Sequence, residues 1–391
     1  MKIIADNKIP FLRGALEPFA EVLYLPGKET TAEVVKDADA LITRTRTICN
    51  EALLKGSRVK VIATATIGFD HIDTAWCETN GIIWRNAPGC NSWSVKQYIT
   101  ALLLSVARRR GLSLEGMTLG VVGVGNVGSK VAEAASILGM KVLLNDPPRE
   151  RREYPETCYN SEKAAGRRRN PFVSLDEIIS RSDIITLHVP LQKDGPDATW
   201  HLFDAARLAS LRPDQILFNS SRGPVVDNKA LKAALQEHRI AGACLDVWEG
   251  EPELDPELVD LLDFATPHIA GYSADGKANG TTAAVRTIAE VLGLPLTDWK
   301  ASGVPAPAQS IEFEIDAAGR SAQEVLTEAV LHTYDLQADS DALRADLGAF
   351  EKLRGDYPVR REFDSFTVHL SGGTPDLTDR LRRLGFVVRE R

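Results

Sequence analysis

Short apolar runs alternate with helix-periodic segments along the first part of the chain. Four runs predict buried strands, KIIAD, AEVLYL, ADALITR and KVIATAT, and residues 31–37 and 51–56 predict helices between them. Apolar runs of about four to eight residues without polar alternation are typical of parallel strands that are covered on both faces. The pattern therefore predicts a small α/β substrate domain over residues 1–93, completed by residues 271–292, with ligand-facing side chains at its strand ends.

A loop with the sequence NAPGCNSWS and a long helix at residues 95–109 predict a domain junction. Beyond it, helices and apolar strands alternate again, which predicts a doubly wound parallel sheet of the Rossmann type over residues 94–270. The Pro/Ala-rich segment SGVPAPAQ follows. Residues 293–391 predict a third, α+β domain with strands IEFEID, FDSFTVHL and GFVVRE and helices at 321–334, 341–354 and 376–384.

This C-terminal domain contains no set of residues that predicts chemistry. A unit of its size with few large apolar side chains buries only a modest core, so we expect a second copy of the chain to pack against it. We therefore predict a homodimer, with effector binding as the alternative role of the domain.

Residues 118–146, TLGVVGVGNVGSKVAEAASILGMKVLLND, predict a strand, a tight turn, a helix and a second strand. Gly123 permits the turn, Gly125 lets the backbone approach a pyrophosphate, and Gly128 lets helix and strand pack closely. Asp146 ends the second strand, where an acid that binds the ribose hydroxyls of NAD is expected. The alternative is a structural βαβ unit without a ligand. The candidate cofactor-binding residues of the turn are Gly123, Gly125, Asn126, Val127 and Gly128.

Arginines follow Asp146 directly in the sequence PPRERR and could accept the 2′-phosphate of NADP. We favour NAD because the Asp146 carboxylate would repel that phosphate, and we expect Arg149, Arg151 and Arg152 on a solvated face. Residues 147–171 lack apolar periodicity and predict a surface loop. A phosphate site in its GRRRN segment is an open alternative.

Composition and charge exclude several classes of protein. The net charge of −8 predicts neither a basic surface that binds nucleic acid nor a polybasic membrane anchor. The N-terminus lacks the apolar segment of a signal peptide and no apolar run is long enough to span a membrane, so we expect a cytoplasmic protein. The five cysteines are scattered and form no CxxC or Cys/His cluster, so we expect reduced thiols and no metal.

Three polar residues close to strand ends of the larger sheet predict hydride-transfer chemistry: Arg222 in NSSRGPVVD, Glu251 in LDVWEGEPEL and His268 in TPHIAG. Oxidation of a secondary alcohol needs a base for the hydroxyl proton, and a carboxylate that stabilises the resulting imidazolium. A cation must also hold the carboxylate of the substrate, and the arginine fork does this at two points. His188 in TLHVPL lies at the same edge and is expected to shape the cofactor site. Taken alone, His268 would be interpreted as a structural histidine.

The motifs FNSSRGPVVD, CLDVWEGEPEL and TPHIAG resemble successive signatures of the D-2-hydroxyacid dehydrogenase family over about residues 1–290. The resemblance implies an NAD-dependent enzyme with Arg222, Glu251 and His268 as its catalytic residues. It implies substrate contacts from Thr45, Thr66 and Tyr272, and a C-terminal domain that mediates dimerisation. It also implies cofactor contacts from Asp146, Ser220, Ser221, Asp246 and Gly271.

Within that family, NDPPR, HIAGYSADGKANGTT and EKLRGDYPVRREF are similar to members that act on a phosphorylated four-carbon 2-hydroxy acid. The second anionic end of such a substrate needs a further cationic patch, for which Arg44 and Arg46 are the candidates. Val189 stands where the family often has threonine, so the cofactor site of this chain lacks the hydroxyl that threonine would supply. The alternatives are another family member, such as one that oxidises 3-phosphoglycerate, and a non-enzymatic NAD-sensing scaffold.

Overall fold

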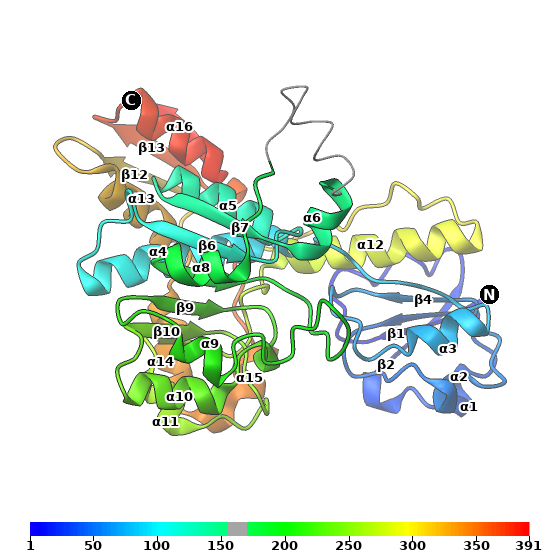
Figure 1. Ribbon diagram of the computed structural model, residues 1–391. Helices are drawn as coiled ribbons and strands as arrows, with labels where there is room; N and C mark the ends of the chain where they lie inside the picture. Colours follow the sequence, from blue (N-terminus) through cyan, green and yellow to red (C-terminus); the bar gives the residue numbers. More distant parts are fainter. Residues whose placement is uncertain (155–169, 391) are drawn as a thin grey trace, which may run out of the picture. The chain divides into compact units, whose positions relative to one another are not determined.

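The computed structural model describes residues 1–154 and 170–390 (Figure 1). It divides into two compact units, each of which is formed by two separate stretches of the chain. The first unit comprises Met1–Ser94 and Tyr272–Ala306, and the second comprises Val95–Gly271 and Pro307–Arg391.

The first unit contains a five-stranded parallel sheet with the order β2-β1-β3-β4-β5. Alternate residues of its strands lie in two separate cores: Ile3 packs with Val285 of the long helix α12, whereas Ile4 packs with Val35 and Leu53 of α1 and α2. Both faces are thus covered, as the continuous apolar runs predicted. The strands are β1 (Lys2–Asp6), β2 (Glu21–Leu25), β3 (Ala40–Thr43), β4 (Val61–Thr64) and β5 (Ile83–Arg85), and the helices are α1 (Ala32–Val35), α2 (Glu51–Leu54), α3 (Thr74–Thr79) and α12 (Ala274–Leu292).

The second unit contains a six-stranded parallel sheet with the order β11-β10-β9-β8-β6-β7, which confirms the predicted doubly wound fold. Its strands are β6 (Thr118–Val122), β7 (Lys141–Asn145), β8 (Ile184–Leu187), β9 (Ile216–Asn219), β10 (Gly242–Leu245) and β11 (Phe264–Ala265). Its helices are α4 (Ser92–Arg110), α5 (Gly128–Ile137), α6 (Pro147–Glu153), α8 (Leu175–Arg181), α9 (Ala205–Ala209), α10 (Asn228–Gln236) and α11 (Pro256–Leu261), with a 3₁₀ turn η2 (Gly223–Val225).

The C-terminal part of this unit adds a three-stranded parallel sheet with the order β12-β13-β14. Leu343 and Phe350 from its helices are buried in the same core cluster as Leu245 and Ala265 of the larger sheet. The strands are β12 (Glu312–Asp316), β13 (Thr367–Ser371) and β14 (Val387–Glu390), and the helices are α13 (Ala322–Thr333), α14 (Leu336–Ala345), α15 (Phe350–Gly355) and α16 (Pro375–Leu384).

Two local predictions were wrong. The single helix expected at 341–354 is interrupted, because Asp346 is extended (φ −153°, ψ 95°) and begins a separate 3₁₀ turn, Leu347–Ala349. The loop expected from residue 147 begins as helix α6, because Asp146 caps it and prolines occupy its first turn, where a missing N–H costs nothing. The GRRRN segment of the expected loop lies outside the described residues.

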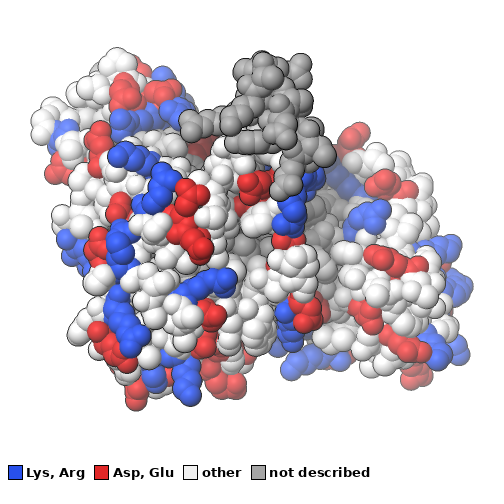
Figure 2. Space-filling view, viewed as in Figure 1, with Lys and Arg blue, Asp and Glu red and all other residues white. Residues whose placement is uncertain are grey.

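Acidic and basic side chains are interspersed over the face of the molecule in Figure 2. No helix among the described residues is long and apolar enough to cross a membrane. Cys49, Cys77 and Cys244 are buried free thiols.

Candidate active site

Most of the predicted residues of the second unit follow the carboxyl ends of its parallel strands. Gly123 follows β6 and His188 follows β8, the two neighbouring strands at which the strand order changes direction. Open α/β sheets bind ligands at such a switch point. A Cβ at Gly123 would lie 2.5 Å from the carbonyl oxygen of His188, so the two segments are in close contact. The other predicted residues follow the remaining strands: Asp146 after β7, Ser220, Ser221 and Arg222 after β9, Asp246 and Glu251 after β10, and His268 and Gly271 after β11.

The turn between β6 and α5 fits a dinucleotide. Gly123 has a left-handed φ of +86°, and a Cβ at Gly128 would lie 1.9 Å from the Gly123 carbonyl oxygen. Only glycine therefore lets α5 begin this close to β6. Gly125 faces open space, since nothing lies within 4 Å of the position of its Cβ. The N-cap residue Val127 supplies no side-chain hydrogen bond, so the N-terminus of α5 is open to an anionic group such as a pyrophosphate.

Asp146 is fixed at the end of β7 by two backbone groups. Its Oδ2 accepts the Val124 N–H at 2.8 Å and its Oδ1 accepts the Arg149 N–H at 2.9 Å, and further lone pairs remain for ribose hydroxyls. The expectation that Arg149 belongs to a solvated face was wrong. Because Asp146 starts helix α6, Arg149 lies in its first turn, and its side chain donates to the carbonyl oxygen of Val124 at 2.6 Å and to Glu153 at 2.8 Å.

The segment that carries Arg222 is held by the side chain of Asn219. The Asn219 Oδ1 accepts the N–H and the hydroxyl of Ser221 at 3.0 and 2.8 Å, and its Nδ2 donates to the Arg222 carbonyl oxygen at 2.9 Å. Gly223 lies against the backbone of Trp248, where a Cβ would come within 1.9 Å of the carbonyl oxygen. The Arg222 guanidinium donates to the Ser221 carbonyl oxygen at 2.8 Å, which orients it at the sheet edge.

Glu251 and His268 form a hydrogen-bonded pair. The Glu251 Oε2 lies 2.8 Å from the His268 Nδ1, and its Oε1 accepts the Trp248 N–H at 2.9 Å. Because a carboxylate only accepts, Nδ1 carries the proton and the Nε2 lone pair is available to a substrate. Burial alone would raise the pKa of Glu251, but the hydrogen bond and charge of His268 and the Trp248 N–H hold it below its usual value. The arrangement can therefore act as a general base.

Asp246 organises the turn that presents His268, residues 266–270, which we call the histidine turn. Asp246 is 2% exposed and accepts the Thr266 hydroxyl and the Ile269 N–H, both at 2.7 Å, and the Ala270 N–H at 2.9 Å. The Tyr98 hydroxyl lies 2.7 Å from the Thr266 oxygen and donates to it, because the Thr266 proton is used by Asp246. Burial raises the pKa of Asp246 despite these bonds.

Ser220 and His188 are placed where a cofactor could use them. The Ser220 hydroxyl is buried and has no hydrogen-bond partner within residues 1–154 and 170–390. The His188 Nε2 lies 3.0 Å from the Thr186 hydroxyl, and burial lowers the pKa of His188 to about 3, which keeps the ring neutral. Val189 packs against the core of the sheet and offers no polar atom.

The predicted substrate residues of the first unit also share one sheet edge. Arg44, Thr45 and Arg46 follow β3, and Thr66 follows the neighbouring strand β4. The Arg44 guanidinium donates to the carbonyl oxygen of Lys8 at 3.2 Å. Lys8 follows β1 at this edge and is a cation that the sequence analysis missed. Its place two residues after the strand KIIAD was the available signal.

Tyr272 directly precedes Ser273, the N-cap residue of α12, and a glycine of ADGKANGTT explains how this helix is placed. A Cβ at Gly280 would lie 2.4 Å from the Ala65 carbonyl oxygen, so the helix approaches the end of β4 as closely as a backbone allows. Ser273 caps the helix by accepting the Gly276 N–H at 2.8 Å. The Lys277 ammonium lies 4.8 Å from the centre of the Tyr272 ring.

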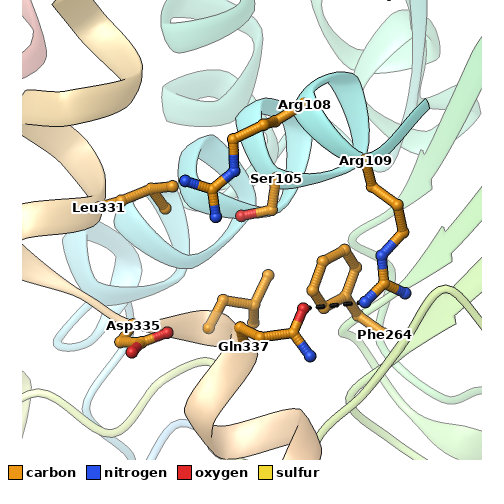
Figure 3. Close-up of a pocket in the computed structure, with 8 residues that line it drawn as sticks. Ser105, Arg108, Arg109, Phe264, Leu331, Asp335 and Gln337 are labelled. Atoms are coloured by element: carbon orange, nitrogen blue, oxygen red, sulfur yellow. Dashed lines mark hydrogen bonds between the residues drawn. The ribbon is translucent and has the colours of Figure 1, made fainter. Parts of the chain in front are cut away.

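A cavity of about 220 Å³ lies elsewhere in the second unit (Figure 3). Arg109 of α4 and Gln337 of α14 face each other across it and are joined by a hydrogen bond of 2.8 Å. Its lining includes Phe264, the first residue of β11, so it lies at the amino end of that strand. His268 follows the opposite end. We therefore do not assign this cavity to the reaction.

Comparison with known proteins identifies the family. Residues 85–270 match the family model of the NAD binding domain of D-isomer specific 2-hydroxyacid dehydrogenases, and residues 307–385 match a domain of unknown function. The erythronate-4-phosphate dehydrogenase of Bacteroides fragilis is 49% identical over 94% of this chain and 99% of that protein. The chain belongs to the erythronate-4-phosphate dehydrogenase family. The protein of the same name from Porphyromonas gingivalis is 41% identical over 99% of this chain and 100% of that protein.

A solved structure gives the same picture of the fold. The D-lactate dehydrogenase of Aquifex aeolicus, in complex with NAD and lactic acid, aligns with a TM-score of 0.61 and 26% identity over 78% of this chain and 100% of that one. The predictions of an NAD-dependent dehydrogenase and of a Rossmann-type sheet are thereby confirmed.

Proposed function

We propose that this protein oxidises 4-phospho-D-erythronate to (R)-3-hydroxy-2-oxo-4-phosphobutanoate with NAD, as a step in the formation of pyridoxal 5′-phosphate. One observation carries this proposal. The His268 Nδ1 lies 2.8 Å from the Glu251 Oε2 beyond the carboxyl ends of the strands of the larger sheet, in a chain that is 49% identical to an erythronate-4-phosphate dehydrogenase.

Each of the proposed catalytic residues has a separate role in the oxidation. NAD, when bound, accepts a hydride from C2 of the substrate. His268 takes the C2 hydroxyl proton on Nε2 as the carbonyl forms, and Glu251 stabilises the imidazolium through Nδ1. Arg222 binds the substrate carboxylate at two points, which fixes the direction of the C2–H bond. In the cofactor site, Asp146 accepts hydrogen bonds from the ribose hydroxyls, and Ser220 supplies a hydroxyl that has no partner among residues 1–154 and 170–390.

The first unit supplies the proposed groups for the rest of the substrate. Arg44, Arg46 and the neighbouring Lys8 carry positive charge at one sheet edge, as a phosphate requires. Thr45 and Thr66 offer hydroxyls there, and Tyr272 offers a phenol. Removal of one of these cations should lower kcat/KM for the phosphorylated acid more than for unphosphorylated D-erythronate.

A substrate panel tests the function. Purified protein with NAD is given 4-phospho-D-erythronate, 3-phosphoglycerate and D-lactate, with NADH absorbance and mass spectrometry of the product as readouts and His268→Gln as the control. We expect turnover of 4-phospho-D-erythronate with the highest kcat/KM. A preference for 3-phosphoglycerate would contradict the substrate, and NAD binding without turnover of any acid would favour a sensing scaffold.

The same proposal includes a homodimer formed through the C-terminal sheet. Two large apolar side chains at that sheet support it, because Ile311 is 47% exposed and Val387, on edge strand β14, is 46% exposed. Covering such side chains with a second copy would stabilise the dimer. Light scattering at micromolar concentration should give twice the chain mass, and Val387→Glu should shift the equilibrium toward monomer. A monomeric wild-type protein would contradict the dimer.

A further inference from the structure

Arg360 connects the C-terminal domain of unknown function to the histidine turn. It lies within the matched residues 307–385, in the sequence YPVRREF, and it is only 4% exposed. Its Nη2 donates to the carbonyl oxygens of Ile269 at 3.1 Å and Ala270 at 2.6 Å. These are the two residues that directly follow His268.

The C-terminal domain provides a dedicated site for this cation. The guanidinium carbon lies 4.6 Å from the ring centre of Tyr334 and 5.7 Å from that of Tyr357, so two aromatic faces surround the charge. Both phenols donate to Asp339, at 2.9 and 2.6 Å, which orients the rings. A buried charge is tolerated only where such partners compensate for its desolvation. The site therefore holds the Arg360 side chain in one position.

Asp246 contacts the same two residues through their opposite groups. It accepts the N–H groups of Ile269 and Ala270, while Arg360 donates to their carbonyl oxygens. The peptide groups after His268 are thus fixed by an anion and by a cation. His268 itself has a φ of +57°, a left-handed conformation that a non-glycine residue keeps only where its surroundings enforce it.

We propose that Arg360 is a positioning residue for the reaction, and that the C-terminal domain is therefore required for catalysis and not only for assembly. Arg360 contacts neither substrate nor NAD in this proposal. It acts through Ile269 and Ala270, by holding the histidine turn so that the His268 Nδ1 stays on Glu251 and Nε2 stays toward the substrate. The inference rests on the proposed role of His268 as the base.

Substitution of Arg360 in the full-length chain tests this role. Arg360→Met removes both donors and the charge, and Arg360→Lys keeps the charge but loses the planar fork. We expect kcat of the methionine variant to fall about 10²-fold, as for a reacting group displaced by about 1 Å, with the Kd for NAD changed less than about twofold. The lysine variant should recover part of this loss. Histidine-selective ¹⁵N NMR should show one tautomer of His268 in the wild type and a mixture in Arg360→Met.

Arg344 provides a matched control. Arg344 also lies in the C-terminal domain. It donates to two backbone carbonyl oxygens in the segment that precedes β11, those of Val259 at 2.7 Å and Leu262 at 2.8 Å, and both lie outside the histidine turn. Arg344→Met should lower Tm while kcat and the His268 tautomer stay as in the wild type. Equal losses of kcat in both methionine variants, in proportion to their losses of Tm, would show a purely structural role and overturn the proposal.

The NMR measurement separates failure of this inference from failure of the proposed function. If the wild type oxidises none of the 2-hydroxy acids, the function fails, yet the tautomer of His268 in the Arg360 variants still decides whether Arg360 positions the ring. If Arg360→Met does not fold, Arg360→Lys carries the test. A folded lysine variant with unchanged kcat and an unchanged His268 spectrum overturns the proposal.

Discussion

The hydrogen bonds of Glu251 make its amide variant a direct test of His268 as the base. One carboxylate oxygen accepts the Trp248 N–H at 2.9 Å and the other lies 2.8 Å from the His268 Nδ1. In Glu251→Gln, the single remaining oxygen stays on the Trp248 N–H, because an NH₂ group in that place would face another donor. The NH₂ group then faces Nδ1, which must become an acceptor, and the proton of the ring moves to Nε2.

A ring with its proton on Nε2 cannot take a proton from the substrate. We therefore expect kcat to fall about 10³- to 10⁴-fold, the size of loss seen when the orienting carboxylate of a Ser-His-Asp triad is replaced by its amide. The Kd for NAD should hardly change, since Glu251 is proposed to contact only the histidine and the Trp248 backbone. Steady-state NADH production at saturating substrate measures the loss. Combining Glu251→Gln with His268→Gln should cost little more than either change alone, because the two residues act as one unit.

Glu249 supplies the matched control for this substitution. One of its oxygens lies 2.7 Å from the His201 Nε2 and the other accepts the Asn228 N–H at 2.8 Å, so it forms the same kind of pair two positions away. Glu249→Gln should keep kcat within about threefold of the wild type, as for a surface pair of modest worth. A Glu251→Gln variant with near-normal turnover, or a Glu249→Gln variant that loses as much, would refute the assignment.

Three further predictions concern the substrate, the cofactor and pH. Arg222→Lys keeps the positive charge but loses the two-point contact with the substrate carboxylate, so kcat/KM should fall. Unchanged kinetics would show that another residue binds the substrate carboxylate. Asp146→Ala should raise the Kd for NAD, measured by calorimetry, and reduce the difference between the Kd values for NAD and NADP. Equal Kd values for both cofactors in the wild type would show that Arg149, and not the Asp146 carboxylate, decides which cofactor binds. Burial lowers the pKa of His188 to about 3 in the folded protein, whereas the pKa of a histidine in the unfolded chain is ~6.5. Between these two pH values the His188 ring is protonated in the unfolded chain and neutral in the folded protein, so a fall in pH favours unfolding. The free energy of unfolding should therefore fall by up to ~2 kcal/mol from about pH 6.5 to pH 5, and by less in His188→Gln; an equal slope in both proteins would exclude His188 as the cause.

The sequence predicted the strand ends well because each depends on local pattern. The apolar run before Asp146 favoured a strand, and parallel strands place their ends at one edge, so Asp146, His188 and Asp246 lie at the same edge of the sheet. Helix caps are equally local, since Ser174 and Glu177, three positions apart, form a capping box at the start of α8. Strand β5 was missed because it is three residues long, and the apolar run at residues 82–84 is shorter than the four to eight residues from which a strand is predicted.

Contacts between distant segments were beyond the reach of these patterns. Arg360 and Ala270 are separated by 90 positions, and nothing in either local sequence indicates their hydrogen bond. Arg149 looked like a surface residue because its neighbours are charged, but its side chain turns back to the carbonyl oxygen of Val124 once Asp146 starts a helix. Such contacts follow from how the elements pack, and composition does not encode them.

The position of β11 explains why a dehydrogenase of this kind would need support from its C-terminal domain. This strand has two residues, Phe264–Ala265, and lies at the edge of the sheet, so within the described part of the chain only β10 pairs with it. Helix α14 covers its open side, where the Ala265 N–H donates to the Ser340 hydroxyl at 3.2 Å. An edge strand of this length gives little rigidity to the residues that follow it.

The charges around the histidine turn replace the rigidity that the strand cannot provide. A left-handed non-glycine residue costs on the order of 1–3 kcal/mol, and hydrogen bonds to charged groups contribute roughly 1.5–3 kcal/mol each. The three bonds to Asp246 alone could balance the strain at His268, but burial of this carboxylate, which raises its pKa, offsets part of their contribution. Burial likewise lowers the pKa of Arg360, and the nearby tyrosines, Asp339 and Asp246 more than restore it. The anion from the sheet and the cation from the C-terminal domain therefore hold the same two peptide groups from opposite sides, so loss of either leaves the strained histidine with support from one side only.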